Sequence, residues 1–419
     1  MLRLKALFRR TTSSNVILSL IWPSPAIRRS PIWPRSCTSA FRRSPSWSRS
    51  CSPRTLSPTS GGRRPNVYGL TNSAIYFAGI EVSRDQIVLV ITDLQNNIIQ
   101  SERKSDFALD DTDECLETIC STIENFLAGS GIDRTKLEAA LARWEFEMRV
   151  RDFGPYTPGV GLCMQTLESW LYGGRVNPKT GRSYKYFTHK EQSLSEIMEK
   201  RFGHRVLIEN DTRARCYGEY VKGCTGQEKN IIYLNLGRGV AIGIIIDGKL
   251  YYGRSGFAGE FGHTPYFDNE IICDCGKKGC LETEVSGIAI ENKMMNQIRN
   301  GRTTILMDKF QKQHKIHIND IIGAARNDDT LSIELIEEAG EKIGKSIAFL
   351  INIFNPEQVI IGGSLANAGD YLMLPLKSAV NKYSLRLVYN DTLFRATTLD
   401  DSIGSLGAAM LIRNQIISL

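Results

Sequence analysis

The amino-acid sequence predicts an α/β protein of two lobes that begins with an irregular segment. A chain of 419 residues is long enough to form two lobes that each bury a core. Its 42% hydrophobic and 23% charged residues are ordinary for a folded protein. Beyond residue 72, segments with the two-residue period of strands alternate with segments that have the period of helices, which is typical of α/β proteins.

The first lobe is expected at residues 73–205. Residues 75–82 and 86–92 have strand patterns, and residues 111–128 carry apolar side chains at helical spacing. Residues 139–172 are rich in Trp, Phe, Met, Gly and Pro and have no clear period. We interpret this last stretch as an irregular insertion or as a second stretch that is translated out of frame.

The second lobe is expected at residues 206–419, where the patterns are clearer. A helix predicted at 194–202 ends the first lobe. Within the second lobe the sequence predicts helices at 211–220, 287–298 and 332–354, and strands at 206–209, 230–235, 241–247, 249–252 and 358–361. A last helix around residues 405–411 is rich in small residues that suit close packing, and we expect it to return to the first lobe.

The start of the chain differs in composition from the rest. Residues 1–60 hold 11 Lys and Arg and no acidic residue, which leaves 41 basic and 45 acidic residues elsewhere, a net charge of −4. The formal charge of +7 therefore comes from this segment. Because prolines interrupt any helix there, we interpret residues 1–72 as a basic irregular segment and linker.

Three interpretations of residues 1–60 stay open. Their basic, Ser-rich composition imitates a transit peptide, but the prolines argue against the amphipathic helix that such a peptide needs. A basic disordered tail is the second interpretation. We favour the third, translation out of frame, because a neighbouring frame of residues 26–51 permits two amphipathic runs in a helix-turn-helix pattern.

One short run carries a complete set of metal ligands. His263 is followed by Cys273, Cys275 and Cys280, at offsets of 10, 12 and 17 residues. One imidazole and three thiols suit a tetrahedral zinc ion, and glycines between the cysteines permit a tight turn. The alternatives are unlinked cysteines or a local disulfide, which the short Cys273–Cys275 spacing disfavours. We expect one structural zinc ion, in a reducing compartment.

Acidic and amide side chains accompany this run. Glu260 and Glu282 flank the ligands, which indicates a small-molecule site as well as a zinc knuckle. Asn210 and Asp211 lie where a strand pattern ends and a helix pattern begins, which is where α/β proteins form ligand sites. Asp211 could be a general base for a sugar hydroxyl, with Asn210 bonding a neighbouring hydroxyl, or it could simply cap the helix.

Two glycine-bearing turns follow strand patterns. One contains Gly237 and Gly239, and the other contains Gly362 and Gly363. Such turns can present backbone N–H groups to the phosphates of a nucleotide. Ordinary turns have the same composition, so the glycines alone do not decide between a phosphate-binding turn and an ordinary turn.

Together these stretches resemble the ROK family, named for its repressors and sugar kinases, over residues 60–419 apart from the insertion. The resemblance implies an actin-like (ribonuclease H-like) sugar-kinase fold, with two lobes around a cleft. It also implies a set of residues that contact a sugar: Asn210, Asp211, Glu260, His263 and Glu282. In the family Asp211 occupies the catalytic-base position, and His263 would serve both the zinc ion and the sugar.

The two phosphate turns separate kinases from regulators in this family. Family kinases carry Asp-x-Gly-Gly-Thr in the first turn, whereas the matching run here is Glu81-Val-Ser-Arg-Asp85, without either glycine. The second turn, normally Gly-Thr-Gly-x-Gly-Gly-Gly, is Gly237-Arg-Gly-Val-Ala-Ile-Gly243. We therefore expect the nucleotide-binding turns to be degenerate and Asp211 not to be used as a base.

The resemblance favours a bacterial, cytoplasmic transcriptional regulator of carbohydrate metabolism that senses a sugar or sugar derivative. The link Ser60-Gly-Gly-Arg-Arg-Pro65 resembles the one that follows the winged helix-turn-helix of the family's repressors. Operator DNA is the expected partner of intact relatives but not of the chain as written. We expect a homodimer or homotetramer and no membrane contact. The alternative is a sugar kinase, a glucokinase or N-acetylhexosamine kinase, which would need ATP.

Overall fold

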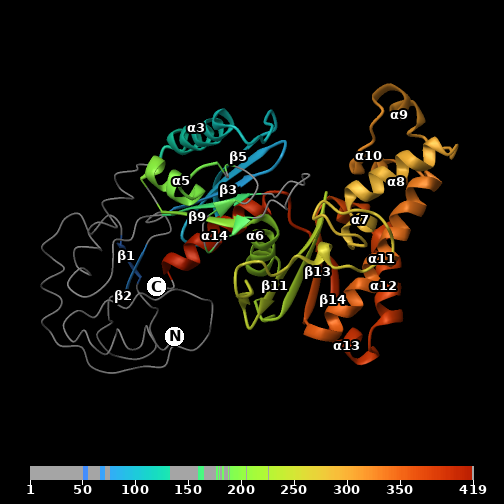
Figure 1. Ribbon diagram of the computed structural model, residues 1–419. Helices are drawn as coiled ribbons and strands as arrows, with labels where there is room; N and C mark the ends of the chain where they lie inside the picture. The colour runs from blue at the N-terminus through green and yellow to red at the C-terminus, as the bar shows by residue number, and fades with distance from the viewer. Residues whose placement is uncertain are drawn as a thin grey trace, which may run out of the picture.

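Two five-stranded sheets with helices packed on them form the two lobes of the described chain. The computed structural model describes residues 51–54, 67–70, 76–132, 159–164, 176–177, 179, 182–183, 187, 189–203, 205–224 and 226–417. The two lobes lie next to each other, each built on a five-stranded sheet (Figure 1). None of the helices in these ranges has the length and apolar character needed to cross a bilayer.

The first sheet has the strand order β5-β4-β3-β6-β9. Its strands are β3 (Phe77–Val82), β4 (Ile87–Thr92), β5 (Ile98–Lys104), β6 (Gly159–Met164) and β9 (Arg205–Asn210). Strands β3, β4 and β5 are antiparallel neighbours joined by short turns, whereas β6 and β9 run parallel to β3. Both β3 and β4 are buried along their whole length, because helices cover both faces of the sheet.

Helices α3 (Asp113–Gly129) and α5 (Leu194–Phe202) cover one face of this sheet, and α14 (Ile403–Ile417) covers the other. The side chain of Ser193 and that of Glu196 form a reciprocal capping box at the start of α5. Aliphatic side chains of β3, β4, α3 and α5 form the core between them.

The second sheet has the order β12-β11-β10-β13-β14. Its strands are β10 (Ile231–Leu236), β11 (Val240–Ile246), β12 (Lys249–Leu250), β13 (Gln358–Gly362) and β14 (Leu393–Ala396). Side chains of β10 alternate between the faces: Ile232 and Leu234 join the main core, while Ile231 and Tyr233 pack with Cys216 of the helix on the other face.

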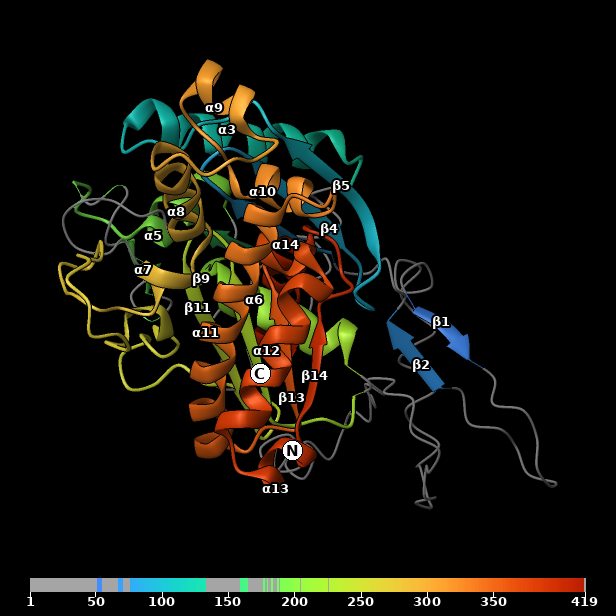
Figure 2. The same ribbon diagram turned by 90° about the vertical axis from the view of Figure 1, so that its right-hand side faces the viewer.

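Helices on the outer face of this sheet enclose the main core. They are α7 (Glu282–Val285), α8 (Gly287–Arg299), α9 (Met307–Gln313), α10 (Ile318–Ala325), α11 (Thr330–Phe354), α12 (Asp370–Tyr383) and α13 (Arg386–Asp391). The long helices α11 and α12 run next to each other in front of β13 and β14 (Figure 2). The sequence had indicated α8 and α11 but assigned no element to residues 364–404.

Two helices lie between the sheets. Helix α6 (Asp211–Gly218) packs on β11 and continues into a π-helical turn, η4 (Glu219–Gly223), while α14 packs on both β3 and α6. A Cβ added to Gly79 of β3 would lie 1.8 Å from the carbonyl oxygen of Ser405 in α14. Glycine at position 79 therefore permits the close approach of α14 to the first sheet.

Two expectations need correction. Residues 159–164 lie within the expected irregular insertion at 139–172, yet they form β6, between β3 and β9. A central parallel strand does not need alternating polarity, so its Gly-containing sequence gave no strand signal. In addition, β9 belongs to the first sheet, so that sheet ends at Asn210 and the second sheet begins with β10.

Two further ribbons complete the described chain. Strand β1 (Cys51–Arg54) pairs with β2 (Val67–Leu70), and β7 (Val176–Asn177) pairs with β8 (Arg182–Ser183). No strand was expected within residues 1–60, because the pairing partner of β1 lies beyond that segment and the segment itself has no period. Residues 1–50 lie outside the described residues, as does the remainder of 139–172.

Candidate functional site

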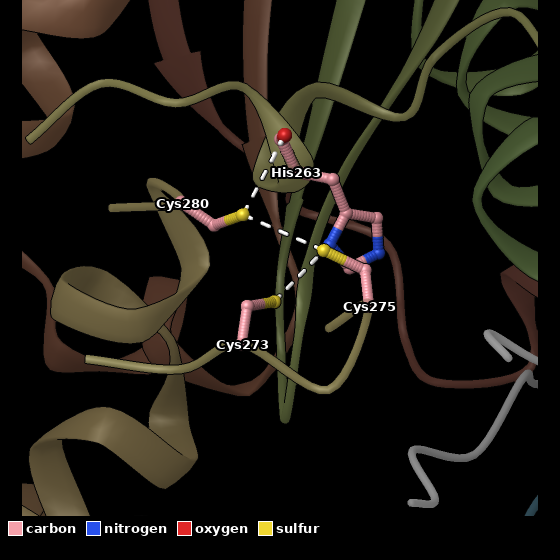
Figure 3. A group of neighbouring side chains, drawn as sticks. All are labelled: His263, Cys273, Cys275 and Cys280. Carbon is pink, nitrogen blue, oxygen red and sulfur yellow. Dashed lines mark hydrogen bonds between the residues drawn. The ribbon is translucent and has the colours of Figure 1, made fainter. Parts of the chain in front are cut away.

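The four expected metal ligands form a compact cluster. One ligand atom each of His263, Cys273, Cys275 and Cys280 lies within 4.8 Å of the others, with the sulfurs gathered beside the imidazole (Figure 3). Nδ1 of His263 lies 3.4 Å from Sγ of Cys273, and the sulfurs of Cys275 and Cys280 are 3.6 Å apart. Because a disulfide needs about 2 Å between sulfurs, the local disulfide considered above is absent and these thiols are free.

Short turns bring the ligands together. His263 ends the 3-10 helix η5 (Phe261–His263), and Cys280 lies two residues before α7. Gly279 has a φ of +71°, and a Cβ there would lie 2.1 Å from the carbonyl oxygen of Phe267. This position therefore requires glycine, and the backbone turn that it permits aims Cys280 at the cluster.

The donor set fits a tetrahedral metal ion. Cys273 and Cys280 are 4% and 0% exposed. Burial, together with the thiol of Cys275, raises the pKa of Cys280 to about 11. A divalent cation would reverse this effect, because it stabilises the thiolate form directly. Three sulfurs and one imidazole nitrogen are a ligand set that holds structural zinc in proteins.

Asn210 and Asp211 join β9 to α6. Oδ1 of Asn210 accepts a hydrogen bond from the backbone N–H of Arg213 over 3.2 Å, so Asn210, and not Asp211, caps the helix. Asp211 is 5% exposed, and its Oδ2 accepts from Nδ2 of Asn235 over 3.3 Å. Burial raises the pKa of Asp211 to about 6, against the opposing charge of Arg215. The carboxylate has the environment of a perturbed functional group.

Glu260, His263 and Glu282 form one unit with the ligand run. The N–H of His263 donates to the carbonyl of Glu260 over 3.2 Å. Glu282 is 8% exposed, and its Oε2 accepts from the N–H of Val240 over 2.8 Å. A Cβ at Gly262 would lie 3.1 Å from that oxygen. The backbone of Glu260 is thus joined to the ligand run, and the carboxylate of Glu282 to the start of β11.

Arg213 links this unit to Asn210 and Asp211. Its Nη1 donates to the carbonyl of Ala258, two residues before Glu260, over 3.2 Å. Sequence reasoning did not identify Arg213, because its partner Glu209 lies in strand β9, outside the helix in which a four-residue spacing would signal an ion pair. The residues expected to contact sugar therefore fall into two groups that Arg213 holds next to each other.

The Gly362-Gly363 turn has a packing requirement of its own. A Cβ at Gly362 would lie 2.0 Å from the hydroxyl oxygen of Tyr233. Gly363 has a φ of +84°, and a Cβ there would lie 2.4 Å from the carbonyl oxygen of Leu236. Both glycines are needed by the fold whether or not a nucleotide binds.

The Gly237–Gly239 turn uses its backbone groups internally. The N–H of Gly237 donates to the carbonyl of Gly239 over 3.1 Å, and the carbonyl of Gly237 accepts from the N–H of Gly287 over 2.8 Å. Between the glycines, Nε of Arg238 is buried and has no hydrogen-bond partner within the described ranges. A turn that binds phosphate needs backbone N–H groups that point outward. Because the N–H of Gly237 bonds to Gly239 within the turn, this turn is poorly suited to bind a phosphate.

The first phosphate turn contains a buried ion pair. Glu81 of β3 is 1% exposed, and its Oε1 lies 2.5 Å from Nη2 of Arg215 in α6. Its Oε2 has no hydrogen-bond partner in the part of the chain described, and a Cβ at Gly404 would lie 2.1 Å from it. The charge of Glu81 is therefore balanced by Arg215, and the absence of a side chain at Gly404 leaves room for its second oxygen beside the first turn of α14.

Comparisons with known proteins place this site in a family. The ROK family model matches residues 174–415. The chain is 32% identical to a glucokinase of Halalkalibacterium halodurans over 223 residues, which are 53% of this chain and 68% of that protein. It is 27% identical to a xylose repressor of Caldicellulosiruptor bescii over 369 residues, 86% of this chain and 84% of that protein.

A solved structure agrees with the fold. The crystal structure of a ROK family transcriptional regulator, a homolog of the E. coli MLC protein, superposes with a TM-score of 0.66 at 25% identity. The match covers 84% of this chain and 81% of that chain. The expected actin-like sugar-kinase fold is thereby confirmed. Since the family model matches more than half of the sequence, this chain belongs to the ROK family.

Proposed function

We propose that this chain is a sugar-responsive transcriptional regulator of the ROK type without kinase activity. The observation that carries the proposal is the Glu81–Arg215 ion pair in the first phosphate turn. Where the family's kinases have two glycines, Ser83 and Arg84 follow here. A carboxylate that is already neutralised by an internal guanidinium attracts a metal–nucleotide complex poorly, and side chains obstruct the backbone that would approach phosphates.

The extent of the matched regions supports a regulator. The xylose repressor matches over 86% of this chain, whereas the glucokinase matches over 53%. The longer match includes sequence outside the part that the two kinds of protein share. This difference in the matched length favours a function like that of the repressor over one like that of the glucokinase.

The proposed sugar site is supported by the chemistry of the donors and acceptors that these residues carry. Oδ1 of Asn210 caps α6, so its Nδ2 group would donate to a sugar oxygen. Nδ1 of His263 faces the sulfurs, so Nε2 would face the sugar and the metal would orient the ring. The carboxylates of Asp211, Glu260 and Glu282 would accept bonds from sugar hydroxyls.

Zinc is the metal that we propose for the cluster. Its ligands would be His263, Cys273, Cys275 and Cys280. Bound there, it would stabilise the run that carries Glu260 and Glu282, because a structural zinc ion contributes folding free energy. The chemistry of the site would remain that of hydrogen bonding to a sugar.

Operator DNA would be bound through an N-terminal domain in intact relatives. Residues 1–72 of this chain occupy that place, but their sequence as written lacks the apolar stripe that a helix-turn-helix needs. We propose a cytoplasmic homodimer or homotetramer, in which sugar binding shifts the arrangement of the lobes by favouring one of two states.

A second function, ATP-dependent sugar kinase, is favoured by one observation. Asp211 is buried and has a pKa of about 6, which suits a general base for a sugar hydroxyl. In that case the turns with Gly237, Gly239, Gly362 and Gly363 would have to hold ATP despite the geometry described above.

The two functions are separated by assaying the purified full chain with D-glucose, N-acetyl-D-glucosamine and D-xylose. We expect one of these sugars to raise the melting temperature of the wild type and of Glu337→Gln, a matched control on the exposed side of α11. Asp211→Asn and Glu260→Gln should lose that shift. When Mg²⁺ and ATP are added, formation of ADP at roughly 1–1000 turnovers per second would reject the regulator and establish the kinase.

A further inference from the structure

Two buried side chains and one half-buried side chain form a polar cluster beside the proposed sugar site. Nε of Arg213 donates to Oε1 of Glu209 over 2.7 Å, and the hydroxyl of Tyr252 donates to Oε2 of Glu209 over 2.9 Å. The guanidinium of Arg213 also lies over the ring of Tyr252, 5.5 Å from its centroid. The Arg213 and Glu209 side chains are 4% and 8% exposed, so this is an ion pair inside the protein.

Every side-chain oxygen of Glu209 has a partner. Oε1 accepts a second bond from the backbone N–H of Asn210 over 2.8 Å, and Oε2 accepts from Tyr252. A buried pair of this kind adds little net stability compared with apolar packing, but removing one partner leaves an uncompensated charge. The ion pair is therefore better explained by the segments that it holds in place than by its contribution to stability.

Arg213 holds both groups of the proposed sugar site. Its side chain pairs with Glu209, the residue before Asn210, while its backbone N–H, which other residues could also supply, donates to Oδ1 of Asn210. Its Nη1 donates to the carbonyl of Ala258, in the segment that leads to Glu260. The next residue, Gly259, has a φ of +100°, and its carbonyl accepts from the N–H of Ile242 over 2.9 Å. The segment is thus attached to α6 on one side and to β11 on the other.

We infer that Arg213 is a positioning residue that keeps Glu260 at a fixed place relative to Asn210 and Asp211, so that one sugar can contact all three. This inference rests on the proposed function, because it concerns the same sugar. Arg213 itself does not touch the sugar. Arg213 holds the segment that leads to Glu260 in place before the sugar binds. Less conformational entropy is then lost when the sugar binds, which is how preorganisation raises affinity.

Hydrogen exchange of the sugar-free full chain tests the positioning role directly. In Arg213→Met we expect backbone amides of residues 252–260 to exchange about tenfold faster, while those of β10 keep the wild-type rate. Arg201→Met is the matched control, since Arg201 also pairs with two carboxylates, Glu117 and Glu124, but lies on α5. That control should leave residues 252–260 unchanged.

A milder variant keeps the test decisive if Arg213→Met fails to fold. Tyr252→Phe removes only the hydroxyl that bonds Glu209 and should raise exchange over residues 252–260 by a smaller factor, in the same segment. Unchanged exchange over residues 252–260 in the folded variants would overturn the inference.

Sugar affinity is the second measurement, because a purely structural role of Arg213 would not change it in the way described below. The three sugars named above are titrated into wild type, Arg213→Met, Glu260→Ala and the double variant. If Arg213 acts through Glu260, the double variant loses no more affinity than Glu260→Ala alone, whereas independent effects would add. Additive losses would overturn the inference. If the wild type binds none of the sugars, the proposed function fails, and the exchange experiment still decides whether Arg213 positions the segment.

Discussion

The side-chain amide of Asn235 donates a hydrogen bond to Oδ2 of Asp211 over 3.3 Å, and so connects β10 of the second sheet to the first turn of α6. The same amide reaches the hydroxyl of Thr212 over 3.0 Å. Asp211 is consequently held between the two sheets, in surroundings that raise its pKa to about 6 from an ordinary value of 3.8.

This environment predicts that Asp211→Asn changes the pH dependence of stability. A raised pKa means that the folded protein binds the proton more tightly than the unfolded chain between the two pKa values. Ionisation of Asp211 therefore destabilises the fold increasingly as the pH rises from about 4 to 6, and the cost stays constant above that range.

Urea unfolding measures the effect. Between about pH 4.5 and pH 7.5, the stability of Asp211→Asn relative to wild type should increase by about 2 kcal/mol. A stability difference that is the same at both pH values would show that Asp211 is not perturbed.

The cluster of His263, Cys273, Cys275 and Cys280 predicts a zinc content of one equivalent per chain. Cys275→Ala should lose the metal and lower the melting temperature, because a structural zinc ion contributes to folding. Elemental analysis of protein purified under reducing conditions gives the measurement. Cys224→Ala is the control, since Cys224 lies outside the cluster near Gln358 and should keep the metal. Zinc-free wild-type protein of full stability would refute the assignment.

The Glu81–Arg215 pair predicts a strongly coupled double-mutant cycle. Arg215→Met leaves the buried carboxylate of Glu81 without its cation and should cost about 3–5 kcal/mol of unfolding free energy. Adding Glu81→Gln should restore a large part of that loss. Arg302→Met is the control: its pair with Glu334 is 46% and 51% exposed, and should contribute less than about 1 kcal/mol. Additive effects in the cycle would mean that Glu81 and Arg215 do not stabilise the fold through their interaction.

Particular residues show what the sequence could and could not predict. The spacing of Cys273, Cys275 and Cys280 identified a ligand cluster because short loops confine such residues to one place. Glu81 and Arg215 are 134 residues apart, and their pairing depends on how α6 packs against the first sheet, which no local pattern contains. Strand β6 was missed for a related reason, since its neighbours β3 and β9 are distant in sequence.

The cap of α6 illustrates the limit within a short motif. The sequence allowed either Asp211 as a cap or Asp211 as a ligand contact. The structure gives the cap to Asn210, because the backbone turns into the helix at that residue and its Oδ1 reaches the N–H of Arg213. A shift of one residue in the start of the helix decides which side chain is available to a ligand. Helix propensity alone does not determine where the helix starts.

The composition of residues 1–60 predicts DNA binding without sequence choice. With 11 basic and no acidic residues, the chain as written should bind any duplex weakly, and the affinity should fall steeply as salt is raised. Fluorescence anisotropy with two unrelated duplexes measures this, and a chain that begins at residue 61 should lose the binding. A sharp footprint on one sequence would contradict the expectation, whereas restoring the neighbouring reading frame should create such a footprint.

The central claim, a sugar site without phosphoryl transfer, is tested most directly by calorimetric titration of sugar into the full chain with Mg²⁺ and ATP present. We predict that D-glucose, N-acetyl-D-glucosamine or D-xylose gives heat that saturates at one site per chain, with the baseline returning after each injection. A kinase would instead produce a sustained displacement of the baseline, because turnover continues until substrate is exhausted. Sustained heat would contradict the absence of catalysis, and no heat with any of the sugars would contradict the sugar site.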